Sequence, residues 1–336
     1  MTATSLRHAF VPTVVGTLVV LAIMLWCDAA SPNVRAAQST LSVHPTGSGT
    51  ACAQAQPCSM HVALEQAEEG DTILLAGGVH TGSGEAVMET ARSATLQGGW
   101  DGASSGDVTF DMAAHPSIID GEGQRRGVLI SEGITVSLDG LSVTNGANSA
   151  AGAGLYARDS NVELRNTSFC SNVVSGADRT HGGRAMVEGG TLRAERCVFR
   201  ANNAARVQYP FGGALVTSGS LNVLVTECLF LDNDANTASA LYFRADEGDA
   251  PAVRIFRTRF EGNGHGRSEG PGRGAYAAAL HVQGAEVELR GNTLTDNWGL
   301  SGRGTASFSH GSLLMTENTV AGNELGADPG IYCQSV

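Results

Sequence analysis

A Phe-x-x-Asn motif recurs about every thirty residues through the second half of this 336-residue chain. Successive asparagines of the motif lie 30, 31, 30, 34 and 26 residues apart. The motif is formed by Phe169 and Asn172, Phe199 and Asn202, Phe230 and Asn233, and Phe260 and Asn263, then in weaker form by Leu294 and Asn297 and by Val320 and Asn323. A fixed period of this length indicates that each repeat makes one turn of a solenoid stacked on the turn before it.

Each repeat also contains short segments with the pattern of β-strands. Small or hydrogen-bonding residues precede the apolar member of each motif by two positions, so both side chains point into one interior. These residues are Thr167, Cys197, Cys228, Thr258, Asn292 and Asn318. Small-apolar stretches such as residues 212–215 and alternating segments such as residues 223–225 supply two further strands. Three strands per repeat, with glycine at the corners, predict an all-β parallel solenoid in which the Phe and Asn columns are architectural.

Residues 1–36 have the features of a secretory signal. A short basic segment precedes an apolar run from Phe10 to Cys27, and a small-residue cleavage pattern ends at Ala36. The alternative is an uncleaved membrane anchor, because this run of about 18 residues just reaches spanning length. Export predicts a protein that is secreted or held at the cell surface, with membrane contact only through this segment if it is retained.

The six cysteines that follow the signal are an even number, which suits disulfides in an oxidising compartment. Cys52 and Cys58, six residues apart in a polar loop, are the predicted pair and belong to an N-terminal extension over residues 37–58. Metal binding by this pair is not favoured, since no CxxC motif or histidine cluster accompanies it. The pairing of the others stays open, although Cys197 and Cys228 fall in register as stacked thiols or one buried bridge. Those others are Cys170, Cys197, Cys228 and Cys333.

The β-helix itself is expected over residues 59–336 and needs a cap on its first coil. The segment HVALEQAEE, residues 61–69, predicts a short helix that ends at Gly70 and is followed by a strand at residues 72–75. An amphipathic helix at this place would cover the exposed start of the solenoid.

The net charge argues against generic binding to nucleic acid. The chain has 33 acidic and 21 basic residues, which gives a net charge of −12, and all of the basic residues are arginine. An acidic protein of this kind repels a phosphate backbone.

Several segments resemble the exported bacterial right-handed parallel β-helix proteins of the pectate-lyase-like superfamily. They are residues 41–81, LQGGWD at 96–101, SIIDGEGQRRGVLI at 117–130 and LDGLSVTNG at 138–146. The GGAL at 212–215 and the Phe-x-x-Asn repeats are also similar to those of chlamydial polymorphic outer-membrane proteins, although no carboxy-terminal barrel segment is present. The resemblance implies a right-handed parallel β-helix at or outside a bacterial cell surface.

Within this superfamily, an enzyme would be a polysaccharide lyase or a polygalacturonase-like hydrolase acting on a uronate-containing polymer. The candidate catalytic residues are Asp232, Asp234, His265 and Arg267, because paired carboxylates and a nearby histidine suit glycoside hydrolysis. The rest of the hydrolase pattern is missing, and lysine, a usual lyase base, is absent. The acids of residues 246–249 share one loop, so the sequence predicts no cofactor and gives calcium no clear ligand cluster.

A binding role has more support, because the long loops fall at one point in the repeat and should emerge along one edge. Aromatic faces stack on sugar rings, and arginine grips carboxylates or sulfates. The predicted ligand-binding residues are Tyr209, Phe211, Tyr276, Trp298, Arg206, Arg273 and Arg303. The sequence therefore favours a non-catalytic protein that binds a glycan or another surface ligand along this loop edge. A third interpretation is a structural spacer whose open end stacks on another protein.

Overall fold

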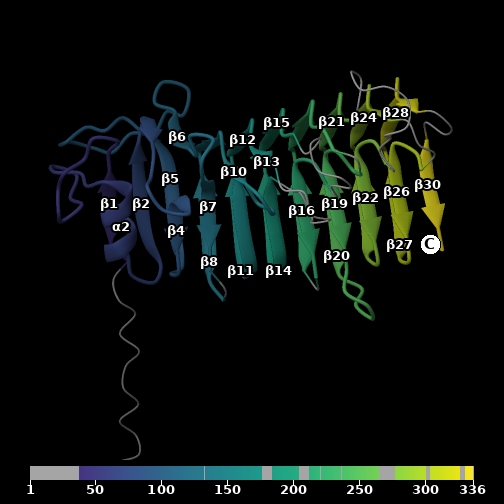
Figure 1. The fold of residues 1–336 in the computed structure, drawn as a ribbon, viewed down its shortest axis with the longest axis horizontal. Helices are drawn as coiled ribbons and strands as arrows, with labels where there is room; N and C mark the ends of the chain where they lie inside the picture. The colour runs from purple at the N-terminus through teal and green to yellow at the C-terminus, as the bar shows by residue number, and fades with distance from the viewer. Residues whose placement is uncertain are drawn as a thin grey trace, which may run out of the picture. The chain divides into compact units, whose positions relative to one another are not determined.

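The computed structural model describes residues 38–131, 133–175, 184–203, 212–219, 221–235, 237–264, 277–299, 303–325 and 330–335. These residues form a solenoid in which parallel strands from successive coils pair side by side (Figure 1). The predicted all-β solenoid is confirmed. Each complete coil contributes one strand to each of three sheets, and two long strands link the first sheet to the second.

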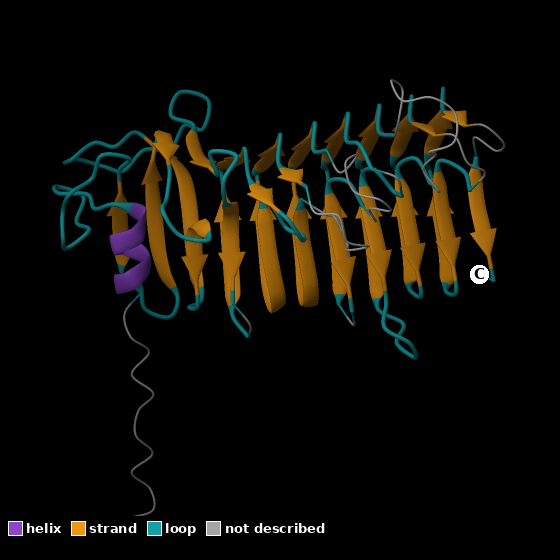
Figure 2. Ribbon diagram, in the orientation of Figure 1, coloured by secondary structure: helices purple, strands orange, loops and turns teal. Residues whose placement is uncertain are grey.

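The bounds of the strands follow the order of the coils (Figure 2). The first sheet contains β1 (Thr40–Val43), β2 (Asp71–Ala76), β5 (Ala94–Trp100), β8 (Thr135–Asp139), the second halves of β11 (Leu155–Arg165) and β14 (Ala185–Glu195), β17 (Asn222–Thr226), β20 (Ala252–Phe256), β23 (Glu286–Arg290) and β27 (Ser312–Thr316). The second sheet contains β4 (Ala86–Thr90), β7 (Arg126–Ile130), the first halves of β11 and β14, β16 (Leu215–Ser218), β19 (Leu241–Arg244), β22 (Leu280–Gln283), β26 (Ala306–Ser309) and β30 (Ile331–Gln334). The third sheet contains β3 (Gly78–His80), β6 (Ser117–Asp120), β9 (Leu141–Thr144), β12 (Ser168–Cys170), β15 (Val198–Arg200), β18 (Leu229–Leu231), β21 (Arg259–Glu261), β24 (Thr293–Thr295) and β28 (Thr319–Ala321). Two short pairs follow the third sheet, β10 (Ala147–Asn148) with β13 (Val173–Val174) and β25 (Trp298–Gly299) with β29 (Glu324–Leu325).

A column of stacked phenylalanines fills the interior beneath the third sheet. Phe169, Phe199, Phe230 and Phe260 occupy equivalent places on adjacent coils, and each ring is buried. Successive ring centroids lie 5.2, 4.7 and 4.9 Å apart with nearly parallel planes. The spacing follows from the distance of about 4.8 Å between paired strands, which brings like side chains into contact.

A ladder of asparagines, buried from Asn172 to Asn297, runs beside the phenylalanines. Its members are Asn172, Asn202, Asn233, Asn263, Asn297 and Asn323. Each Nδ2 from Asn172 to Asn297 donates to Oδ1 of the asparagine in the next coil, at 2.9 to 3.3 Å. From Asn202 onward, Nδ2 also donates at 2.9 Å to a main-chain carbonyl of the preceding coil. The ladder thus provides partners for turn groups that would be costly to bury without hydrogen bonds.

A second polar ladder lies at the corner between the first and third sheets. Each backbone N–H from Cys197 to Asn292 donates to the side chain at the same place in the next coil, at 2.9 to 3.3 Å. The participating residues are Cys197, Cys228, Thr258, Asn292 and Asn318. Cys197 and Cys228 are free buried thiols, so their register produces stacking and not a bridge.

The residues just before this second ladder show that glycine forms only some of the corners, as Gly291 does with φ 65°. Asn166, Arg196, Glu227, Arg257 and Glu317 all have positive φ angles, between 47° and 59°. A left-handed conformation costs a non-glycine residue about 1–2 kcal/mol. The ladder hydrogen bonds that begin at the next residue offset this cost, so side chains other than glycine are accepted.

A short helix and a disulfide lie at the N-terminal end of the solenoid. Helix α2 spans Met60–Gln66, a shorter range than the predicted 61–69, and it contacts β1 and β4. The Ser59 hydroxyl caps it by accepting from the Val62 N–H at 3.4 Å. Cys52 and Cys58 form the expected disulfide immediately before it. No helix among the described residues is both long enough and apolar enough to cross a membrane.

Candidate ligand-binding face

The outer face of the second sheet carries a continuous row of side chains from successive coils. Its members, in strand order, are Leu129, Tyr156, Met186, Val216, Tyr242, His281, Ser307 and Tyr332. In the middle of the row, Ala151 and Ala238 pack against Met186, Val216 and Tyr242, which are buried. The N-terminal part, around Leu129 and Tyr156, is more accessible.

A hydrogen-bonded group joins β11 to β14 in this accessible part. The Tyr156 hydroxyl donates to the Glu188 carboxylate at 2.6 Å and accepts from Arg158 Nη2 at 2.7 Å. Arg158 Nε also lies 3.5 Å from Glu188 Oε2, so each of the three side chains contacts the other two. Burial, then the hydrogen bond to Glu188, raises the pKa of Tyr156, so the phenol keeps its proton at neutral pH.

Tyr156 also lies among cationic groups. The guanidinium carbons of Arg126 and Arg158 lie 5.2 and 5.8 Å from its ring centroid. Arg126 is itself buried and paired with Glu85. These contacts hold the Tyr156 ring between two guanidinium groups, and Tyr156 is only half-buried.

Two depressions meet at Arg158. One, of about 420 Å³, is lined by residues 129–131 with Tyr156 and Arg158. The other, of about 460 Å³, is lined by Arg158, Glu188, Ser218, Asp246 and the glycines around residue 190. Gly190 has φ 75°, and a Cβ there would lie 2.1 Å from the Ser160 carbonyl oxygen, so only glycine fits at this position in the lining of the second depression. The two hollows follow one another across coils along the sheet.

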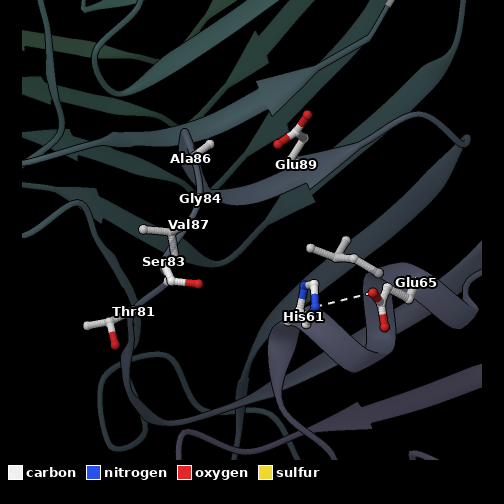
Figure 3. Close-up of a pocket in the computed structure, with 10 residues that line it drawn as sticks. His61, Glu65, Thr81, Ser83, Gly84, Ala86, Val87 and Glu89 are labelled. Atoms are coloured by element: carbon white, nitrogen blue, oxygen red, sulfur yellow. Dashed lines mark ion pairs between the residues drawn. The ribbon is translucent and has the colours of Figure 1, made fainter.

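A larger depression of about 580 Å³ lies where the same sheet begins, between α2 and β4 (Figure 3). His61 and Glu65 on the helix form an exposed ion pair at 3.2 Å, and Glu89 projects from β4 across the hollow. Glu89 is in register with Leu129, so this depression continues the line of the other two.

At the C-terminal end of the row, a histidine and a tyrosine are stacked. The rings of His281 and Tyr242 lie 5.4 Å apart, and Arg303 lies 5.8 Å from the ring of Tyr332. Burial, then the charge of Arg303, lowers the pKa of His281 to about 4. His281 is therefore neutral at pH 7.

Most of the loop edge expected to bind ligand lies outside the described residues. This holds for Tyr209, Phe211, Tyr276, Arg206 and Arg273. Of the remainder, Trp298 is half-buried on β25 and its indole lies close to Gly264. Arg303 lies beside Tyr332 in the row on the second sheet.

The two aspartates proposed as catalytic acids, Asp232 and Asp234, lie in different surroundings. Asp232 is exposed in a left-handed turn conformation, with φ 52°. Asp234 is half-buried, and its charge acts on the buried Arg184, whose Nε and Nη1 each donate to a carbonyl at 3.0 Å. His265 and Arg267 lie outside the described residues. The part of the chain that the structure describes contains no group of three His, Cys, Asp or Glu side chains placed to hold a metal ion.

Sequence reasoning missed Tyr156, Arg158, Glu188 and the buried Arg184. A signal did exist, because Tyr156 and Arg158 lie at alternate positions of one strand segment and Glu188 lies 30 residues after Arg158, one coil later. The register was required to show that these side chains meet.

The comparisons with known proteins concern the fold. A family model described as "Right handed beta helix region" matches residues 119–325. The crystal structure of pectate lyase Pel9A aligns with a TM-score of 0.43 and 12% identity, over 89% of this chain and 78% of that one. No curated protein sequence matches this one.

Proposed function

This chain belongs to the right-handed β-helix family, and we propose that it binds an extended polysaccharide along the outer face of the second sheet without cleaving it. The proposal is supported by the two depressions that meet at Arg158 and follow the direction in which coils stack. A polymer laid along this direction would contact residues from several coils at once.

The chemistry of the accessible part suits sugar hydroxyls. Tyr156, Arg158 and Glu188 bring together a hydroxyl oxygen, a cation and a carboxylate acceptor from side chains that hold one another in place. Preorganised polar groups lose little side-chain entropy when a ligand binds. The mixture of charges accommodates neutral sugars, and Arg158 would pair with a carboxylate or sulfate of an anionic polymer.

We also propose that the protein acts outside the cell or at its surface. The support is the signal-like segment at residues 1–36, together with a disulfide that suits an oxidising compartment.

Retention and cleavage should be measured together with the chain from Ala37 onward. The protein would be incubated with neutral and anionic polysaccharides, with and without calcium, while both bound protein and polymer length are recorded. We expect retention without shortening of the polymer. Cleavage that is lost in Asp234→Asn would contradict this proposal and support a hydrolase.

The face itself is tested by Arg158→Ala. Loss of its charge-assisted contacts should weaken retention by roughly tenfold, equal to about 1.4 kcal/mol. The matched control is Arg257→Ala, which breaks a cross-coil pair with Glu227 of 2.9 Å at another corner. Equal effects of both variants would exclude this face as the binding site.

A further inference from the structure

The depression between α2 and β4 lies where a helix takes the place of a strand in the second sheet. In the following coils a strand of this sheet precedes a strand of the first sheet, as β4 precedes β5 and β7 precedes β8. One coil earlier, α2 precedes β2 in the same way and contacts β4 (Figure 1). The row of strands that forms the proposed binding face therefore gives way to a helix at this point.

This helix rises above the level of the neighbouring strands. Met60 and Ala63 on its inward side are buried in the core, like the inward residues of a strand. The Cα atoms of a helix lie on a cylinder of about 2.3 Å radius, so its opposite side stands farther from the core than a single strand does. His61 and Glu65 extend from that side and are 82% and 64% exposed. The helix forms a wall of the depression (Figure 3).

The line of depressions leads to solvent in the other direction. The middle of the outward row, from Met186 to Tyr242, is buried, so the accessible path leaves the row at Arg158. It continues through the depression lined by Ser218 and Asp246, and the Asp246 side chain is exposed. A polymer bound along this path could extend beyond Asp246, but α2 would stop it beyond β4.

The walled depression contains acceptors for the group that distinguishes a chain end. Inside a polysaccharide each linking oxygen is an ether, whereas at a chain end this oxygen belongs to a hydroxyl group that can donate a hydrogen bond. Glu89 is exposed on β4 and forms no ion pair within the described part of the chain. Its carboxylate lies across the hollow from Glu65 (Figure 3). Two carboxylates that line one hollow can accept a hydrogen bond from such a hydroxyl.

We propose that this protein recognises a polysaccharide by one of its ends, with the terminal sugar in the depression between α2 and β4. The inference rests on the proposed function and names the part of the polymer that is bound. Glu89 accepts the hydrogen bond of the terminal hydroxyl, and α2 blocks any further sugar. The rest of the polymer runs past Tyr156 and Arg158 toward Asp246. Binding to the middle of a long polymer is excluded, because it would require both directions to be open.

The number of chain ends is the quantity to vary in a test. Each polysaccharide that the chain from Ala37 onward retains, with amylose as the neutral probe and polygalacturonate as the anionic probe, would be prepared at two mean lengths. Both lengths would span the line of depressions and would differ by a factor of about five. At half-saturation, the required mass of the shorter polymer should be about fivefold lower, because equal masses then carry about five times as many ends.

The outcomes separate this inference from the polysaccharide proposal. Equal half-saturation masses at the two lengths would overturn recognition of the end and leave polysaccharide binding intact. If no polysaccharide is retained at all, the proposed function fails and this inference fails with it.

Glu89→Gln tests the place of the terminal sugar. The variant keeps the shape of the side chain and loses the charged acceptor, so it should bind the shorter polymer about tenfold more weakly. Glu286→Gln changes another exposed glutamate, on the first sheet, and should bind as the wild type does. Wild-type binding by Glu89→Gln, or an equal loss in both variants, would overturn the inference.

Discussion

Asn233 donates its side-chain amide to Oδ1 of Asn263 at 2.9 Å, and both side chains are almost fully buried. The same amide donates to the Phe199 carbonyl at 2.9 Å, while Oδ1 of Asn233 accepts two hydrogen bonds from Asn202. One side chain therefore supports three coils, and the ladder is as much a part of the core as the phenylalanine column.

Replacing Asn233 with alanine should destabilise the solenoid strongly. Several buried donors and acceptors would lose their partners, at a cost of about 3 kcal/mol in the free energy of unfolding. Urea denaturation followed by circular dichroism measures the change. The control, Asn161→Ala on an exposed strand position, should cost about 0.5 kcal/mol or less, and equal losses would contradict a special role for the ladder.

Phe230→Ala should be at least as damaging. The ring stacks on Phe199 at 4.7 Å and on Phe260 at 4.9 Å, so its removal leaves a cavity between two aromatic rings. We expect a loss of about 3–5 kcal/mol in the same denaturation experiment. The half-buried Phe256 provides a matched control, and Phe256→Ala should cost much less because water can fill the space.

Tyr156→Phe removes one hydroxyl from the proposed binding face. The variant should lose about 1 kcal/mol of stability, since Glu188 and Arg158 lose a shared partner. Polysaccharide retention should fall with it. Tyr332→Phe is the control, because the structure gives the Tyr332 hydroxyl no hydrogen bond to a described residue; retention that falls equally in both variants would count against the face around Tyr156.

Stability should fall on acidification partly because of His281. Its folded pKa is about 4 and its ordinary value is 6.5, so between these pH values the unfolded chain binds a proton that the folded chain does not. The unfolding free energy therefore has its full value above pH 6.5 and falls by about 3 kcal/mol as the pH drops to 4. Unfolding free energies of the wild type and His281→Gln at pH 7 and pH 4.5 test this, and an unchanged pH dependence in the variant would show that other groups dominate.

The fold class could be predicted from the sequence alone, because the period of the repeat equals the length of one coil. Phe199 and Phe230 occupy the same place in adjacent coils, so the number of residues from one to the other equals the length of one turn. The Asn residues are tied to the same register. The handedness entered through resemblance and is supported by the family match, since a spacing of thirty residues is the same in either hand.

The boundaries of local elements were harder to predict. The helix ends at Gln66, before the predicted residue 69, and non-glycine residues such as Glu227 occupy left-handed corners. The helix stops where the Glu68 N–H donates to the Asp71 carboxylate and Arg92 donates to the Ala67 carbonyl. The left-handed corners are accepted because contacts between coils outweigh the conformational preference of a single residue.

The sequence by itself determined the period and the inward-facing columns, because both depend on the spacing between repeats, and it indicated the Cys52–Cys58 pair, because the two cysteines are only six residues apart. Only the tertiary structure decided which outward-facing side chains meet, as Tyr156 and Glu188 do across 32 positions of the chain. Outward positions carry no repeated residue type, so their contacts depend on where the intervening loop returns the chain. The direction of the hydrogen bonds in the asparagine ladder, such as that from Asn233 to Asn263, likewise became visible only in the structure, since the spacing of the residues does not contain it.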